Sequence, residues 1–360
     1  MNPSSLYIHI PFCRGKCLFC AFVISVGQER LRDDYVTALV GEMKNYQGRR
    51  VHSVYLGGGT PSMLSDNQLG ILIKNIRKNF LLETDAEITI EVNPESIDLP
   101  KARFLNTVGF NRVSLGVQST NDRYLKFLGR SHNAKGAMDA YGILREAGFV
   151  NINLDLMYAF PGQTQPELEE DVRAIARQKS EHLSLYTLTI EPNSRFYTTR
   201  MKLDDDEKLA GHYLLVVRIL EEHGFKQYEV SNFAQSGFES QHNINYWQGG
   251  SYIGLGVGAH GFLEDRRYWN TSNLQQYIQK AGRQTVVEGY EDLSVDTKDA
   301  EKLVFGLRMN KGVAWDRVRI DRHKDIQPLI EGGFLVLEHG FLKTTEQGRL
   351  VLDELSIRLI

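Results

Sequence analysis

Cysteine is scarce in this chain. Of 360 residues only three are cysteines, and Cys13, Cys17 and Cys20 all lie within eight positions of one another. An odd and tightly grouped set cannot pair into a disulfide framework, which excludes the small secreted scaffolds that depend on one. Such a group is typical of metal ligands, and we expect a reducing, cytosolic environment.

Long apolar runs and an excess of charge are also missing. No run approaches the roughly 18 residues needed to cross a bilayer, and the first residues lack the basic-then-apolar pattern of a signal peptide. The 42 basic and 45 acidic residues leave a formal net charge of −3, which does not favour a nucleic-acid or membrane-surface binder. With 42% hydrophobic residues, the chain is long enough for a large core and an appended domain.

Strand-like and helix-like segments alternate over the first two thirds of the chain. The predicted strands are 6–10, 51–56, 87–92, 112–117, 151–157, 182–190 and 227–230. The predicted helices between them include 36–43, 66–80, 134–147, 166–178 and 205–223. This alternation gives parallel strands joined by right-handed crossovers. We therefore expect an α/β fold in which residues 1–232 form a whole or partial (β/α) barrel.

The pattern changes after residue 232. Residues 233–299 are rich in glycine and aromatics up to position 262 and polar thereafter, so we expect them to connect two domains. Residues 300–360 predict a helix, then helix, strand, strand and helix, which is a small winged-helix-like α+β domain. We expect this domain to serve packing, because its last helix has no basic stripe for nucleic acid.

The three cysteines directly follow the first predicted strand. Spacings of three and two intervening residues let three thiolates meet one face of an iron–sulfur cubane, whose fourth iron stays open. That iron can chelate the amino and carboxylate groups of S-adenosylmethionine (SAM). A structural zinc site is the alternative, but it needs a fourth ligand, and nearby His9 is expected to point away from the loop.

Further polar and glycine motifs follow the next predicted strands. Gly57, Gly58, Gly59 and Thr60 come after the second strand, where glycine lets a ligand approach the backbone, although an ordinary turn also uses glycine. Acidic or amide side chains mark the third, fourth and fifth strands: Glu91, Gln118 and Asp155. A carboxylate within an apolar barrel is costly unless it is bonded, either to a ligand or to a structural partner at the barrel mouth.

The cysteine spacing, with Phe19 just before the last cysteine, resembles the radical SAM superfamily. That resemblance implies a [4Fe-4S] cluster on Cys13, Cys17 and Cys20 and a SAM molecule flanked by Phe19 and the glycine motif. More narrowly, the segments 7–13, 57–62, 91–94, 112–119, 128–130 and 153–158 resemble the HemN-like group of oxygen-independent coproporphyrinogen oxidases. By this resemblance the further SAM contacts are Tyr7, Thr60, Glu91, Gln118, Arg130 and Asp155.

Within this group the chain is most similar to the HemW-type haem chaperones. Oxidases of the group have a longer N-terminal extension and a fourth cysteine, at whose position this chain has Phe22. The segment from His242 to Trp247 matches the His-Asn-x-x-Tyr-Trp motif associated with haem binding, and implies that haem contacts His242, Asn243, Tyr246 and Trp247. Physically, a histidine can ligate haem iron, and aromatic rings can cover the macrocycle. The simpler interpretation is a loop histidine capped by the asparagine, with the aromatic side chains packing the barrel mouth.

One departure leaves other members of the group open. HemW-type sequences commonly have an acidic residue after the third cysteine, and this chain has Ala21. The alternatives are a coproporphyrinogen dehydrogenase and a methyltransferase or cyclopropane-forming enzyme that uses two SAM molecules.

The resemblance implies a protein that binds haem and passes it to haem-requiring proteins, with no residue assigned a catalytic role. It implies haem, SAM and the cluster as cofactors, and an electron donor for the cluster. We expect a cytoplasmic protein that meets the membrane peripherally when it delivers haem, and a homodimer would fit its exposed barrel edge.

Overall fold

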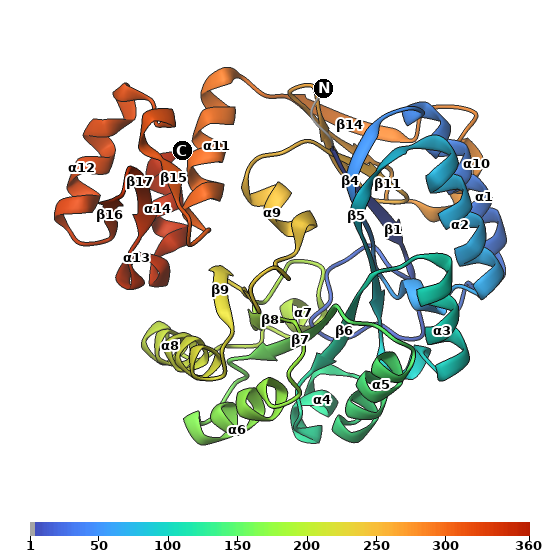
Figure 1. Cartoon of the computed structure of the whole chain (residues 1–360), viewed down its shortest axis with the longest axis horizontal. Coiled ribbons are helices and arrows are strands. Elements are labelled where there is room, and N and C mark those ends of the chain that lie inside the picture. The colour runs from blue at the N-terminus through green and yellow to red at the C-terminus, as the bar shows by residue number, and fades with distance from the viewer. Residues whose placement is uncertain (1–3) are drawn as a thin grey trace.

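The computed structural model describes residues 4–360. Its main feature is a curved, twelve-stranded sheet with helices along its outer side (Figure 1). Seven neighbouring strands are parallel, in the order β11, β1, β4, β5, β6, β7, β8. Their bounds in that order are Tyr252–Leu255, Ser4–Ile10, Arg50–Gly58, Leu81–Val92, Arg112–Gln118, Ile152–Tyr158 and His182–Thr187. The predicted partial barrel is confirmed.

Antiparallel strands extend the sheet at both edges. Beyond β8 lie β10 (Asn232–Ala234) and β9 (Lys226–Glu229). Beyond β11 lie β12 (His260–Leu263), β13 (Arg266–Asn270) and β14 (Val287–Asp292). Much of the segment 233–299, which the sequence predicted as a connection, is therefore part of the main sheet.

Amphipathic helices cover the outer side of the barrel. They are α1 (Arg32–Met43), α2 (Asp66–Asn79), α3 (Leu99–Val108), α4 (Asp122–Leu128), α5 (Ala134–Glu146), α6 (Gln165–Ala176) and α8 (Asp206–Glu222). The short helix α7 (Arg195–Thr198) lies instead beside the cysteine loop, where the Phe196 N–H donates to the Leu18 carbonyl at 3.0 Å. Local signals start several of them; Ser65 and Gln68, for example, form a reciprocal capping box before α2. The sequence patterns did not predict α3 or α4. Among residues 4–360 no helix is both long and apolar enough to span a bilayer.

The core lies between the sheet and these helices. Leu6, Ile8 and Ile10 of β1 are fully buried, as are Leu39 of α1 and Leu72 of α2. Two short strands, β2 (Phe12–Cys13) and β3 (Ser25–Val26), flank the cysteine loop at the carboxyl end of β1.

A buried acidic residue ties α1 to the edge strands. The Glu42 carboxylate accepts hydrogen bonds from Gly256 N–H at 2.9 Å, from Asn270 Nδ2 at 2.7 Å and from the Tyr277 hydroxyl. Burial raises the pKa of Glu42 to about 7, although these hydrogen bonds act in the opposite direction. Tyr277 belongs to α10 (Leu274–Lys280), so one side chain joins three parts of the fold.

The C-terminal domain has its own core and sheet. Its strands β15 (Val313–Ala314), β17 (Phe341–Thr344) and β16 (Leu335–Glu338) lie in that order and are antiparallel. Its helices are α11 (Val295–Leu307), α12 (His323–Glu331), α13 (Glu346–Leu350) and α14 (Leu352–Leu359). The last predicted helix is interrupted at Val351, and α11 begins five residues before the expected boundary at 300.

Helix α9 (Gln241–Trp247) occupies the opening between the two ends of the curved sheet (Figure 1). It also meets the C-terminal domain, because the ring of Trp247 lies 6.2 Å from the ring of Phe305 on α11. The helix therefore links the barrel to the smaller domain.

Candidate functional site

The three cysteines occupy a loop that its surroundings hold in place. Cys13 ends β2, while Cys17 and Cys20 lie in the following loop; all three side chains are partly exposed and none forms a disulfide. Leu18 N–H donates to the carbonyl of Leu128 at 3.0 Å, which anchors the loop to the end of α4.

The protein environment alone favours the thiol form of Cys13 and Cys20. Burial raises the pKa of Cys13 to about 11, and burial also raises the pKa of Cys20. Within residues 4–360 no three His, Cys, Asp or Glu side chains converge as they would around a single metal ion. Each cysteine of a cubane binds a different iron, so an open loop with separated thiols fits a cluster better than a zinc ion.

His9 does not supply a fourth ligand, although its position differs from the expected one. Its Nε2 hydrogen-bonds the Val23 carbonyl at 2.7 Å, so the ring contacts the end of the cysteine loop instead of pointing away from it. Its Nδ1 pairs with the Tyr7 hydroxyl at 3.0 Å. With both nitrogens engaged, the ring supports the loop.

A chain of polar contacts joins two cysteines to two other motifs. Cys13 Sγ lies 3.6 Å from Thr60 Oγ1, which accepts a hydrogen bond from Asn93 Nδ2 at 2.9 Å. Asn93 Oδ1 accepts from Arg130 Nη2 at 2.8 Å, and Arg130 Nη1 lies 3.5 Å from Cys17 Sγ. Arg130 Nε is buried and has no hydrogen-bond partner, so it is available to donate to the carboxylate of a ligand. Asn93, absent from the predicted set, was visible in the sequence only as the third residue of Glu-Val-Asn-Pro.

The glycine motif packs closely against the cysteine loop. The N–H groups of Gly59 and Thr60 donate to the carbonyls of Ile10 and Phe12 at 2.8 and 2.9 Å. Gly58 has φ +106°, and a Cβ there would lie 2.3 Å from the His9 ring. These backbone donors are thus already used within the protein, and the glycines bring the two loops together.

Glu91 lies beside this motif inside the barrel. Its carboxylate accepts from the Tyr55 hydroxyl at 2.9 Å and from Gly58 N–H at 3.0 Å. Burial raises the pKa of Glu91 to about 7, with a further contribution from the nearby Asp155. The ring of Tyr7 stacks 6.3 Å from that of Tyr55, which places both tyrosines in the same polar interior.

Two of the other predicted SAM residues, Asp155 and Gln118, lie on the neighbouring strands β7 and β6. Asp155 accepts from Ser114 Oγ at 2.9 Å and from Asn153 Nδ2 at 2.8 Å, and burial raises its pKa. Gln118 ends β6 in the left-handed region at φ 68°, beside a register shift in the sheet. Phe19 packs against an apolar cluster beside the cysteine loop.

Helix α9 is fixed at its first turn by a residue far away in sequence. The Glu87 carboxylate on β5 accepts from Ser240 Oγ at 3.1 Å and from the N–H groups of Gln241 and His242 at 3.0 and 3.2 Å. The buried Arg112 guanidinium lies 3.9 Å from the same carboxylate. A negative charge at a helix N-terminus stabilises the helix.

His242 is not open to a ligand in this structure. Its side chain is 1% exposed, Nδ1 pairs with Ser53 Oγ at 3.0 Å and Nε2 pairs with the Tyr246 hydroxyl at 3.1 Å. Burial lowers its pKa to about 3, so the ring is neutral. In this structure His242 orients Tyr246 through the hydrogen bond to its hydroxyl.

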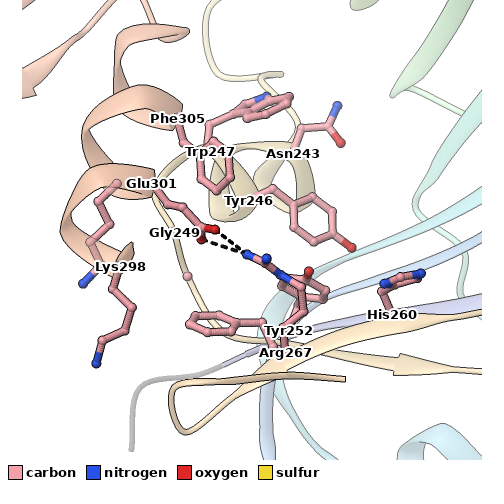
Figure 2. A pocket seen from close by; sticks show the side chains of 13 residues that line it. Asn243, Tyr246, Trp247, Gly249, Tyr252, His260, Arg267, Lys298, Glu301 and Phe305 are labelled. Carbon is pink, nitrogen blue, oxygen red and sulfur yellow. Dashed lines mark hydrogen bonds and ion pairs between the residues drawn. The ribbon is translucent and has the colours of Figure 1, made fainter. Parts of the chain in front are cut away.

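The rest of the motif lines a pocket of about 500 Å³ between α9, the edge strands and α11 (Figure 2). Five aromatic side chains line it: Tyr246, Trp247, Tyr252, Phe262 and Phe305. Polar side chains complete the wall, namely Asn243, His260, Arg267, Lys298, Glu301 and Lys302. This size and lining are typical of a site for a mainly apolar ligand that also carries charge.

The pocket and the cysteine loop lie toward opposite ends of the parallel strands. Ser53, which bonds His242, and Gly58, which packs beneath the loop, are both on β4. They are five positions apart along the strand, which corresponds to roughly 16 Å. The motifs thus define two sites and not one.

Comparison with known proteins identifies the family. The radical SAM superfamily profile matches residues 7–175. A "Heme chaperone HemW" of Lactococcus lactis subsp. lactis (strain IL1403) is 38% identical over 87% of this chain and 83% of its own length. The chain belongs to the HemW family.

Other HemW relatives match over nearly the whole length. The protein of Bacillus subtilis (strain 168) is 34% identical over 98% of this chain and 97% of the relative, and that of Escherichia coli (strain K12) is 35% identical over 99% and 97%. The solved structure of the Escherichia coli coproporphyrinogen III oxidase HemN, a radical SAM enzyme, has a TM-score of 0.86 and 26% identity over 99% of this chain and 90% of that one. Membership of the HemW family and the HemN-like fold both agree with the presence of a cysteine loop and a separate pocket beside α9. The radical SAM superfamily implies a [4Fe-4S] cluster and SAM.

Proposed function

We propose that this chain binds haem and transfers it to haem-requiring proteins. The observation that carries the proposal is the pocket beside α9. Haem presents two flat apolar faces and two carboxylates, so a site for it needs aromatic surface and cations. Tyr246, Trp247 and Phe305 supply the first, and Lys302 supplies the second. His242, the remaining predicted haem residue, supports Tyr246 from behind.

We assign the cysteine loop to the cluster and its surroundings to SAM. The proposed SAM contacts are Tyr7, Phe19, Gly57, Gly58, Gly59, Thr60, Glu91, Gln118, Arg130 and Asp155. When bound, the reduced cluster supplies an electron to the sulfonium of SAM. The side chains themselves orient and desolvate this cofactor: Arg130 pairs with its carboxylate, and Asn93 holds Arg130 and Thr60 in register.

The remaining parts of the proposal concern where the protein acts and with what. Clustered thiols need a reducing compartment, so we place it in the cytoplasm, with contact at the membrane surface when haem is delivered there. Its partners are then haem-accepting proteins and an electron donor for the cluster, and a second copy of the chain could cover the exposed sheet edge.

The test is haem binding and transfer by the intact, anaerobically reconstituted protein. Optical titration with ferric haem should saturate at one equivalent, and mixing the loaded protein with an apo-haemoprotein should move the haem to the acceptor. Trp247→Ala should weaken binding about tenfold, because it removes one flat wall of the pocket. Trp315→Ala is the matched control, since Trp315 stacks on His323 within the C-terminal domain.

Two outcomes would reject the proposal. One is the absence of saturable haem binding by the wild type. The other is oxidative decarboxylation of coproporphyrinogen or formation of a methylated product, since either would favour a HemN-like enzyme.

A further inference from the structure

Haem needs an axial ligand, and the pocket wall contains a second histidine besides the motif. His260 begins β12, is exposed and lines the pocket from the strand side, opposite Tyr246 on α9 (Figure 2). No protein group within residues 4–360 hydrogen-bonds its ring nitrogens. This is the reverse of His242, whose two nitrogens are both engaged.

The sheet fixes the direction of His260. It pairs with Trp269 across β12 and β13, and the two rings stack 6.1 Å apart. Phe262, two residues further along β12, lies on the same face of the strand and also lines the pocket. The ring is therefore placed by an aromatic neighbour and a regular strand, not by a loop.

Two glycines make this placement possible. A Cβ at Gly254 would lie 1.8 Å from the carbonyl oxygen of His260, and a Cβ at Gly261 would lie 2.2 Å from the ring of Tyr268. Only glycine lets β12 lie this close to β11 and to Tyr268. The sequence around His260 thus serves to hold its backbone in one position.

The imidazole is in the protonation state that metal binding requires. Partial burial of the ring lowers the pKa of His260, and the nearby Arg267 guanidinium lowers it further, so the neutral ring is favoured. The other titratable groups facing the pocket are Arg267, which is paired with Glu301 at 2.8 Å, Lys298, which is paired with Asp265 at 2.7 Å, and Lys302.

Lys302 provides the charge that a haem edge needs. Its stem lies over Gly249, where a Cβ would be 2.9 Å from Lys302 Cγ. Its ammonium forms no ion pair with any residue from 4 to 360, while the neighbouring Arg267 and Lys298 are neutralised. A carboxylate of a ligand bound at this edge of the pocket would therefore pair with the Lys302 ammonium, which has no other ion-pair partner among residues 4–360.

We propose that His260 is the axial ligand of the haem and that Lys302 pairs with one of its propionates. This assignment rests on the proposed function and names the groups that would hold its cargo. His242 then acts as a positioning residue, which orients Tyr246 against the macrocycle.

The test replaces the ligand and then returns it from solution. In the reconstituted full-length protein, His260→Gly should lower ferric-haem affinity about tenfold or more and abolish the histidine-type optical and resonance Raman signature. Added imidazole should restore that signature. The control is His339→Gly, which removes an exposed histidine at the turn between β16 and β17 and should bind haem as the wild type does.

Metal-free protoporphyrin separates ligation from packing. Its binding, followed by fluorescence, should be unchanged in His260→Gly but weakened about threefold to tenfold in Lys302→Glu, because the porphyrin keeps its carboxylates and has no iron for His260 to ligate. Equal loss of haem and protoporphyrin in His260→Gly would mean that His260 is only structural and would overturn the assignment.

The outcomes distinguish this inference from the proposed function. If the wild type binds haem and His260→Gly keeps the wild-type spectrum and affinity, the ligand assignment fails and the haem proposal stands. If the wild type binds no haem, both fail.

Discussion

The clearest test of how the pocket is built is the substitution Glu87→Gln, which keeps the shape of the side chain and removes its charge. Glu87 receives three hydrogen bonds at the start of α9, from Ser240 Oγ, Gln241 N–H and His242 N–H, at 3.0 to 3.2 Å. It is also the acidic neighbour of Arg112, and the two side chains are only 8% and 2% exposed.

The expected loss of stability depends on which of the Glu87 interactions the glutamine amide can still make. A glutamine keeps one acceptor oxygen, so at least one charge-assisted hydrogen bond is lost and the buried Arg112 guanidinium loses its ion-pair partner. Removing one partner of a buried pair costs about 3 kcal/mol or more, and a hydrogen bond to a charged group is itself worth about 1.5 to 3 kcal/mol. We expect a loss of about 3 kcal/mol, or a fall in Tm of roughly 4 °C.

The assay is thermal unfolding followed by haem titration. Because α9 carries Tyr246 and Trp247, its loosening should weaken haem binding as well as lower Tm. Glu83→Gln is the matched control: Glu83 is on the same strand and forms a 3.6 Å ion pair with Arg50, which is 64% exposed, so the change should cost less than about 0.5 kcal/mol. A Glu87→Gln protein as stable as Glu83→Gln would refute the reasoning.

Two further changes probe the fold around the sites. Gly58→Ala should destabilise the protein by about 2 kcal/mol more than Gly27→Ala in denaturant unfolding, since both have positive φ but only a Cβ at Gly58 strikes the His9 ring; equal losses would contradict this. Glu42 has a folded pKa of about 7 against 4.5 unfolded, so the stability it contributes is present below pH 4.5 and is lost as the pH rises through 7, by about 3 kcal/mol. Glu42→Gln should flatten this part of the curve of unfolding free energy against pH, and an unchanged slope would refute the assignment.

The barrel and the cysteine site were predictable because their signals are local. Alternating strands and helices specify the parallel sheet, and each site motif directly follows a strand, so the carboxyl ends of the strands bring the motifs together. Asn93 was harder to predict. Its role between Thr60 and Arg130 depends on contacts with residues 33 and 37 positions away.

The second site was less predictable because its geometry is not local. The motif indicated a histidine near haem, but whether His242 is free depends on Ser53, 189 residues away. The strands that form the pocket wall are short and rich in glycine, with β11 and β12 four residues each, so their sequence has little β signal. These segments are strands because they pair with neighbouring strands in the folded protein, and not because their residues have a high β propensity.

Helix α9 lies near the amino-terminal ends of the parallel strands and the cysteine loop lies at their carboxyl ends, so the proposed haem and cofactor sites would have separate entrances. Haem bound beside α9 would then be exchanged at a distance from the cysteine loop. The two sites still share a short line of contacts: Tyr246 meets His242 at 3.1 Å, His242 packs 5.1 Å from Tyr55, and the Tyr55 hydroxyl meets Glu91 at 2.9 Å. This line of contacts connects Tyr246 in the proposed haem pocket to Glu91 in the proposed cofactor site.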